Sequence, residues 1–223
     1  MNFCSVEFEG ALDLALFGET HELHREVEVP DGDILICVGD FTMFSKSMSS
    51  IEDFNEWLGE QPHRHKIIVP GNHEFFLESN PERRSLLDNA ELLIDESIEI
   101  GGMKIYGSPM MPLYGAAFGN SSPKDRERHW RRIPDDTDVL ITHGPPFGVL
   151  DLSPGQVERM GDPELRKRVR ELPSLRLHAF GHVHGSHGIA EQDGVTFVNV
   201  ALMGLLGDLA WQPIALRIPS GMR

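Results

Sequence analysis

Acids, histidines and one asparagine follow five separate apolar runs of this 223-residue chain. The runs are LALF, DILICV, KIIVP, DVLIT and LHAF, and the segments that follow them are GETH at 18–21, GD at 39–40, GNHE at 71–74, HGPP at 143–146 and GHVH at 181–184. Any one of these residues alone would be assigned to an ordinary turn. In α/β sheets, however, ligands gather where the carboxyl ends of neighbouring strands meet, and glycine lets the backbone turn tightly there. Five such segments in succession therefore predict one site.

The side chains in these segments are of the kinds that bind divalent cations. Imidazole, carboxylate and one amide oxygen form a mixed set suited to Mn, Fe, Zn, Co or Ni, and the lack of cysteine in the set argues against a structural zinc site. The set is too large for one ion, so it predicts two ions roughly 4 Å apart with a bridging carboxylate, which suits in-line displacement at phosphorus. The seven candidate ligands are Glu19, His21, Asp40, Asn72, His143, His182 and His184.

The elements that must position these residues alternate between strands and helices. Apolar residues at 51, 54, 57 and 58 lie on one helical face, and capping signals at Ser49 and Ser50 predict where that helix starts, with Gly59 as its stop signal. A second helix is expected to start at Asn80-Pro81 and to run through Leu86-Leu87, because Asn-Pro is a typical cap and first turn.

Two hairpins are expected at glycine-containing turns. Gly101-Gly102 separates the runs IEI and KIY, and QDG at 192–194 precedes VTFVNV. Hairpins mixed with crossover helices imply mixed sheets. We therefore expect the α/β or α+β class, with layers of sheet inside helices. No repeat, low-complexity tract or linker interrupts the chain, so residues 1–223 are expected to form a single domain.

Composition argues against several functions. The 35 acids outnumber the 20 Lys and Arg and give a formal net charge of −15, which opposes binding to long DNA or RNA. The basic clusters at 126–132 and 166–170 are expected to be solvated helix faces.

Apolar runs fall far short of the roughly 20 residues of a membrane span and the N-terminus lacks a signal-peptide pattern, so a cytoplasmic protein is expected. Cys37 is expected to be a buried thiol rather than the disulfide partner of Cys4.

The motifs together resemble the calcineurin-like metallophosphoesterase superfamily. The resemblance rests on Asp40 in GD, GNHE at 71–74, His143 in THGPP and GHVH at 181–184, and it covers roughly residues 12 to 200. Smaller details, such as GDFTMF and IPDDTDVLITHGPP, resemble a compact branch that is similar to class III cyclic nucleotide phosphodiesterases. This resemblance implies a layered sandwich of two mixed β-sheets flanked by helices, with a dimetal site at the carboxyl ends of the strands.

The resemblance also implies a role for each motif residue. Glu19, His21, Asp40 and His184 would hold the first metal ion, Asp40 would bridge to the second, and Asn72, His143 and His182 would complete the second site. His73 would contact the phosphate and protonate the leaving oxygen, and His24 is expected to join Asn72 and His73 in binding substrate. A hydroxide between two divalent cations would be the nucleophile, with Mn expected first and Fe, Zn, Co, Ni or Mg as alternatives. The expected substrate is a small phosphoester such as a cyclic nucleotide, and a homo-oligomer is left open.

Glu19 departs from the aspartate that the family has at its position. Its extra methylene moves the carboxylate by roughly 1.5 Å. Either the backbone retreats and Glu19 still binds, or the first site loosens. The leading interpretation is a metal-dependent phosphodiesterase, and the alternative is a metal- or nucleotide-binding protein of the same fold with vestigial catalysis. A phosphomonoesterase or a nuclease on the same scaffold is a third interpretation, and the acidic composition weighs against the nuclease.

Other polar and aromatic residues near the motifs have simpler interpretations. Glu74 is either an orienting partner of a metal-site histidine or a surface glutamate. The run Phe41-Thr42-Met43-Phe44 is expected to pack at the edge of the site. Four histidines outside the motifs are expected to be structural, namely His63, His65, His129 and His178.

Overall fold

The computed structural model describes residues 10–44, 48–152, 158–204 and 206–220, which form two mixed β-sheets. The first sheet has the strand order β11-β1-β2-β3-β4, in which β1 to β4 are parallel and β11 pairs antiparallel with β1. Its strands are β1 (Ala11–Phe17), β2 (Ile34–Cys37), β3 (His65–Ile68), β4 (Glu91–Leu92) and β11 (Ile214–Pro219).

The second sheet has the order β5-β6-β7-β8-β10-β9. Strands β6, β7, β8 and β10 are parallel, whereas β5 and β9 pair antiparallel at the two edges. Its strands are β5 (Glu96–Ile100), β6 (Met103–Ser108), β7 (Val139–Thr142), β8 (Leu177–Phe180), β9 (Gly188–Gln192) and β10 (Val195–Asn199). The expectation of two mixed sheets is thus confirmed.

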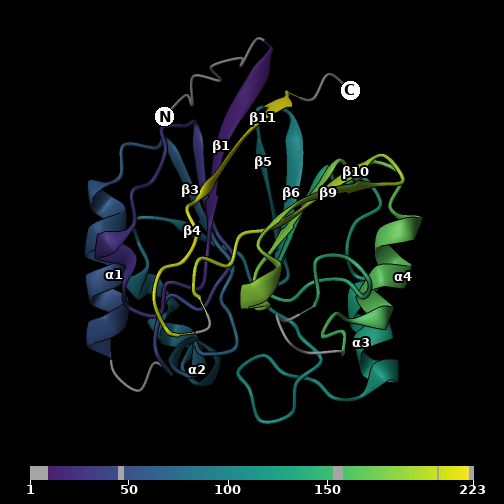
Figure 1. Ribbon diagram of the computed structural model, residues 1–223, viewed down its shortest axis with the longest axis horizontal. Coiled ribbons are helices and arrows are strands. Elements are labelled where there is room, and N and C mark those ends of the chain that lie inside the picture. Colours follow the sequence, from purple (N-terminus) through teal and green to yellow (C-terminus); the bar gives the residue numbers. More distant parts are fainter. Residues whose placement is uncertain (1–9, 45–47, 153–157, 205, 221–223) are drawn as a thin grey trace.

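The sheets face each other between two layers of helices (Figure 1). Successive strand residues point to opposite faces, so Leu14 and Leu16 of β1 enter the core between the sheets, while Ala15 and Phe17 enter the core beneath α1. A third core joins α3 and α4 to the outer face of the second sheet. The helices are α1 (Met48–Glu60), α2 (Phe75–Ser79), α3 (Pro123–Trp130) and α4 (Pro163–Glu171), with 3-10 turns η1 (His24–Glu26), η2 (Pro81–Leu86) and η3 (His184–Ser186).

Two helix predictions need correction. The first helix includes Met48 and ends at Glu60, so Ser49, Ser50 and Gly59 lie inside it rather than at its ends. The segment that begins at Pro81 is a 3-10 helix, and Asn80 makes no side-chain capping hydrogen bond. A short α-helix, α2, ends directly before Asn80. Pro81 restricts the residue before it to non-helical backbone, which separates the two turns.

Both hairpin predictions are confirmed. Gly101 and Gly102 connect β5 to β6, with φ of 58° and 73°. Asp193 and Gly194 connect β9 to β10, with φ of 55° and 80°. Two central residues with positive φ are the requirement of the tight turn that matches the twist of paired strands, which explains the Gly-Gly and Asp-Gly sequences.

The basic clusters lie on helices, but not all of their arginines are solvated. Arg126 of α3 is buried, and its Nε lies 3.1 Å from Oδ2 of buried Asp162. The same oxygen accepts a hydrogen bond from Trp130 Nε1, and Asp162 Oδ1 caps α4 through the backbone N–H of Glu164. The pair therefore ties α3 to α4. Arg166 of α4 is also buried, so the expectation of fully solvated faces is wrong for both residues.

Cys37 lies at the end of β2 and is fully buried, where burial raises the pKa of its thiol well above the usual range. The expectation of a buried thiol is confirmed, and Cys4 lies outside the described residues. Among the helices that the structure describes, none is both long enough and apolar enough to cross a membrane.

His178 of β8 makes stability depend on pH. Its Nε2 lies 2.8 Å from Thr142 Oγ1, which donates its single proton to the Gly144 carbonyl, so Nε2 must carry the hydrogen. Nδ1 has no hydrogen-bond partner among the described residues, and burial lowers the pKa of His178 to about 3. The imidazole is therefore neutral in the folded protein.

Because an unfolded histidine titrates near pH 6.5, the stability that depends on neutral His178 is complete above that pH and is lost as the pH falls toward 3. Between pH 7 and pH 5, the metal-free wild type should lose about 2 kcal/mol more unfolding free energy than His178→Gln, at about 1.4 kcal/mol per pH unit below 6.5. Urea unfolding in the presence of a chelator measures this. Parallel losses in the two proteins would contradict it.

Candidate metal centre

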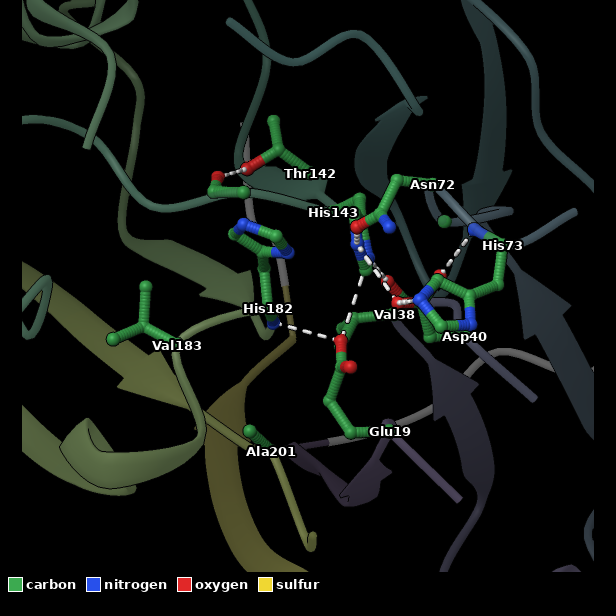
Figure 2. Close-up of polar contacts among 12 residues, drawn as sticks. Glu19, Val38, Asp40, Asn72, His73, Thr142, His143, His182, Val183 and Ala201 are labelled. Carbon is green, nitrogen blue, oxygen red and sulfur yellow. Dashed lines mark hydrogen bonds and ion pairs between the residues drawn. The ribbon is translucent and has the colours of Figure 1, made fainter. Parts of the chain in front are cut away.

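The five ligand-bearing segments converge at the carboxyl ends of five strands. Glu19 and His21 follow β1, Asp40 follows β2, and Asn72 follows β3, all in the first sheet. His143 follows β7, and His182 and His184 follow β8 in the second sheet. A backbone bridge between Gly18 and Ala201 joins the sheets beside them. Figure 2 shows the side chains of both sheets turned toward one another.

Glu19 reaches the middle of this cluster and is fully buried. Its Oε1 accepts a 2.7 Å hydrogen bond from the backbone N–H of His182 (Figure 2). Its Oε2 lies 3.1 Å from His184 Nε2 and 3.3 Å from His21 Nε2. One oxygen is thus fixed by the backbone, and the other faces two imidazoles. The longer side chain is accommodated because Gly181 has no Cβ; a Cβ there would lie 3.0 Å from Glu19 Oε1.

Glu19, His21 and His184 form one group of ligand-type atoms, all within 4.8 Å of one another. His21 Nδ1 lies 3.4 Å from the Thr42 carbonyl, which orients the ring so that Nε2 faces Glu19. Ligands at right angles around an ion with bonds of about 2.1 Å lie about 3 Å apart. The distances from Glu19 Oε2 to the two imidazole nitrogens therefore suit one shared cation.

Asp40 lies between this group and a second one. The second group contains Asp40, His143 and His182, and a third places Asp40 with His21 and His73. Asp40 Oδ1 accepts a 2.8 Å hydrogen bond from the backbone N–H of His73, and Oδ2 lies 3.6 Å from His143 Nε2 (Figure 2). This is the position that a bridging carboxylate requires.

The loops around Asp40 approach one another so closely that two glycines are required. A Cβ on Gly39 would lie 2.4 Å from the Gly71 nitrogen, and a Cβ on Gly71 would lie 2.2 Å from Asp40 Oδ1. Asp40 itself has φ of 51°, and Glu19 has φ of 55°. Non-glycine residues rarely adopt this region, and such strain persists where the surrounding structure holds it.

His143 and Asn72 present two electron-pair donors to the same point. His143 Nδ1 lies 2.9 Å from the Val38 carbonyl, so Nδ1 carries the hydrogen and Nε2 keeps its lone pair. That Nε2 lies 2.8 Å from Asn72 Oδ1 (Figure 2). Two acceptors this close need a cation or a proton beside them. Burial, helped by nearby His143, lowers the pKa of His182 to about 3, which leaves a neutral imidazole suited to metal binding.

The charges of the cluster also fit a cation. Burial raises the pKa of Asp40 well above its usual range, and the carboxylates of Glu19 and Glu74 add to this. Burial likewise opposes ionisation of Glu19, but the neighbouring imidazoles of His143, His184 and His21 hold its pKa well below the usual range. Bound cations would let these buried acids ionise together. The donor set therefore fits two divalent ions.

His73 lies at the edge of the cluster. Its Nε2 is 3.8 Å from Asp40 Oδ2, and its ring lies 4.6 Å from that of His21. Burial, with the charge of His21, lowers the pKa of His73 to about 4. The imidazole lines the pocket and its Nε2 faces Asp40 Oδ2, while the backbone N–H of His73 donates to Asp40 Oδ1.

Glu74 is fully buried, and its contacts differ from both expectations for it. It accepts hydrogen bonds from the backbone N–H groups of Asp40, Thr42 and Gly71, and from the Thr42 hydroxyl. No described hydrogen bond joins it to a histidine, and it is not on the surface. Glu74 instead fastens the loop after β2 to the loop after β3.

His24 is not brought to the cluster. It is buried, its Nε2 lies 2.9 Å from Asp53 Oδ2 of α1, and its ring packs against Phe54 and Trp57. The expected contact between His24 and the substrate is therefore wrong. The four histidines that are expected to be structural lie outside the three ligand groups; they are His63, His65, His129 and His178.

A pocket of about 510 Å³ opens above the cluster. The lining includes His21, Asp40, Asn72, His73, His182 and His184 of the motifs, together with Met43, Phe44, Met160 and Met203. The run at 41–44 is divided: Phe41 and Thr42 are buried, whereas Met43 and Phe44 are about half exposed at the mouth. Sequence spacing alone carried no signal for Met160 and Met203.

The described geometry agrees with a family match. The family model of the calcineurin-like phosphoesterases matches residues 13–186, which contain all five ligand-bearing segments. The chain belongs to the calcineurin-like phosphoesterase family. This family is one of dinuclear metal-dependent phosphohydrolases that act on small phosphoesters, and this phosphoesterase has side-chain groups that could hold such ions.

Relatives of this phosphoesterase cover most of the chain. Human metallophosphoesterase domain-containing protein 1 is 34% identical over 227 residues, which cover 91% of this chain and 69% of the human protein. UPF0046 protein K07C11.7 of Caenorhabditis elegans is 36% identical, with 94% of this chain and 76% of that protein covered. The solved structure of TT1561 from Thermus thermophilus has a TM-score of 0.58 at 9% identity and covers 86% of this chain and 91% of that one, which shows the shared fold.

Proposed function

We propose that this phosphoesterase is a dinuclear metal-dependent phosphodiesterase that hydrolyses small phosphodiesters such as cyclic nucleotides. The observation that carries the proposal is the arrangement of two ligand groups on either side of Asp40, beneath one pocket. Each group has three or more donors at spacings that suit a divalent ion. The net charge of −15 supports a small substrate rather than a long nucleic acid.

The residues divide into two metal sites in this proposal. Glu19, His21 and His184 would hold the first ion, Asn72, His143 and His182 the second, and Asp40 would bridge them. When bound, a pair of divalent cations makes a nucleophile available from water near neutral pH and offsets the charge on the phosphoryl oxygens. Manganese is the cation we expect first, and the imidazole and oxygen donors without thiolate are compatible with it as well as with Fe, Zn, Co or Ni.

The side chains around the ions orient the donors and handle the proton. The carbonyls of Thr42 and Val38 accept from the outer nitrogens of His21 and His143, which turns each Nε2 toward the site. His73 faces the pocket beside Asp40 and Asn72, where it would contact the phosphate and donate its proton to the leaving oxygen. A bound phosphate anion favours the protonated imidazole.

Metal content and substrate preference test the proposal together. After Mn²⁺ loading and gel filtration, elemental analysis should give two ions per chain. The loaded protein should hydrolyse bis(para-nitrophenyl) phosphate and cyclic AMP faster than para-nitrophenyl phosphate. A protein with both ions bound that hydrolyses none of these esters would overturn the proposal. Faster hydrolysis of para-nitrophenyl phosphate than of the two diesters would indicate a phosphomonoesterase instead.

Glu19 decides between catalysis and the alternative of a binding protein with weak turnover. Because Glu19 Oε2 already lies near both His21 and His184, shortening the side chain should withdraw it from them. Glu19→Asp is expected to lower Mn²⁺ affinity at the first site about tenfold and to lower activity with it. Glu19→Gln keeps the shape without the charge and serves as the matched variant. If the wild type has negligible activity and Glu19→Asp raises it, the result would support the alternative of a binding protein with weak turnover.

A further inference from the structure

The outer half of the pocket is apolar, although the inner half is built of ligands. Met43, Phe44, Met160 and Met203 line it together with Gly204 and Gly207. Met43 is 48% exposed and Phe44 is 49% exposed, so about half of each side chain is not covered by packing against the protein. Nearby Phe41, in contrast, is fully buried against Phe54 and belongs to the core.

Phe44 is held in place rather than left on the surface. One face of its ring stacks on His73, with centroids 4.0 Å apart and planes at 18°. Glu22 Oε1 accepts from the backbone N–H of Met43 and from the Ser50 hydroxyl, which fastens this loop to α1. Phe44 has φ of 56°, an unusual conformation for a bulky side chain. About half of the Phe44 side chain remains exposed beside the site.

The described lining of this pocket also lacks positively charged Lys and Arg side chains. Arg159, next to Met160 in the sequence, is directed elsewhere: its Nη1 lies 2.6 Å from Oδ1 of buried Asp151, and its guanidinium lies over Phe147. A second phosphate or carboxylate on a substrate would therefore meet methionine and phenylalanine without a counter-charge, which is costly.

We propose that Phe44 and the three methionines form a subsite for an aromatic ester group of a singly charged phosphodiester. The inference rests on the proposed function and narrows its substrate class. A planar ring would pack against the exposed part of Phe44, and the flexible thioethers of Met43 and Met160 would contact its edge. The phosphate would lie in the same pocket beside His73, Asp40 and Asn72. Aryl groups and nucleobases share this chemistry, whereas alkyl diesters and polyphosphates lack it.

Binding measurements test the subsite separately from turnover. Diphenyl phosphate and dimethyl phosphate are both singly charged diesters, and they differ only in the aromatic groups. Calorimetric titration of the Mn-loaded wild type should show about tenfold tighter binding of diphenyl phosphate, in line with the worth of aromatic stacking. Phe44→Ala should reduce this preference to about twofold or less. Phenol release, followed in parallel, shows whether the ligand stays intact.

Phe147→Ala is the matched control, because Phe147 is 43% exposed but lies outside the pocket lining. It should keep the wild-type preference, and Phe44→Trp should keep it as well. An unchanged preference in Phe44→Ala, or no preference in the wild type, would overturn the subsite. Aromatic preference without hydrolysis of any ester would support the subsite and defeat the proposed function. Hydrolysis without aromatic preference would do the reverse.

Discussion

Replacing Asp40 with alanine is expected to reduce bound manganese to at most one ion per chain and to abolish phosphodiester hydrolysis. Asp40 is the carboxylate shared by the groups that contain His21 and His143, so both sites lose a donor at once. The affinity for Mn²⁺ should fall at least about a hundredfold, since even an outer partner of a metal ligand is worth 10- to 100-fold. Elemental analysis after gel filtration measures the effect.

Asp40→Asn separates metal loss from misfolding. Burial and two neighbouring carboxylates raise the pKa of Asp40, so the charged form is unfavourable in the metal-free protein. The neutral amide should therefore leave metal-free stability equal to that of the wild type or above it, while metal binding is lost. Full retention of two ions by either variant would rule out Asp40 as the bridge.

His73→Ala is expected to lower turnover by about 10²- to 10⁴-fold and to leave two ions bound. The contact that His73 makes with Asp40 Oδ1 comes from its backbone N–H, which alanine retains. Only the imidazole, and with it the proposed proton donor, is removed. Steady-state kinetics and elemental analysis on the same preparation measure both quantities.

The leaving group provides a readout that a purely structural role would not change. Nitrophenolate leaves without protonation, whereas the alkoxide that departs from cyclic AMP needs a proton. His73→Ala should therefore lose more activity on cyclic AMP than on bis(para-nitrophenyl) phosphate. Equal losses on the two esters would remove the proton-donor role, and metal loss equal to that of Asp40→Ala would refute the division between ligand and acid.

The parts of the fold that sequence predicts are those governed by short-range rules. Each buried run that precedes a ligand-bearing segment forms a strand with that segment at its carboxyl end, and Gly101-Gly102 forms a tight turn because positive φ is a local requirement. Gly59 suggests a helix end, whereas α1 continues through it to Glu60; a Cβ on Gly59 would lie 3.1 Å from Asn89 Nδ2.

Long-range partners explain what sequence could not supply. His24 is buried because Asp53 and the rings of α1 pack against it, and nothing in its own neighbourhood indicates that contact. Glu74 lies within a recognised motif, yet its role depends on Asp40 and Thr42 in the loop after β2. The position of the Glu19 carboxylate depends on Gly181, which directly follows β8 of the other sheet. Side-chain chemistry is readable from a motif, whereas its surroundings come from the fold.

The donors of each proposed ion come from both sheets. Glu19 and His21 belong to the first sheet and His184 to the second, and the other group pairs Asp40 and Asn72 with His143 and His182. Bound cations would therefore act as cross-links between the two halves of the sandwich. A site filled at a hundred times its Kd adds about 2.7 kcal/mol against unfolding. The affinity for metal ions should therefore respond to the relative position of the two sheets. Substitutions in the core between the sheets should change this affinity even though they lie away from the ligands.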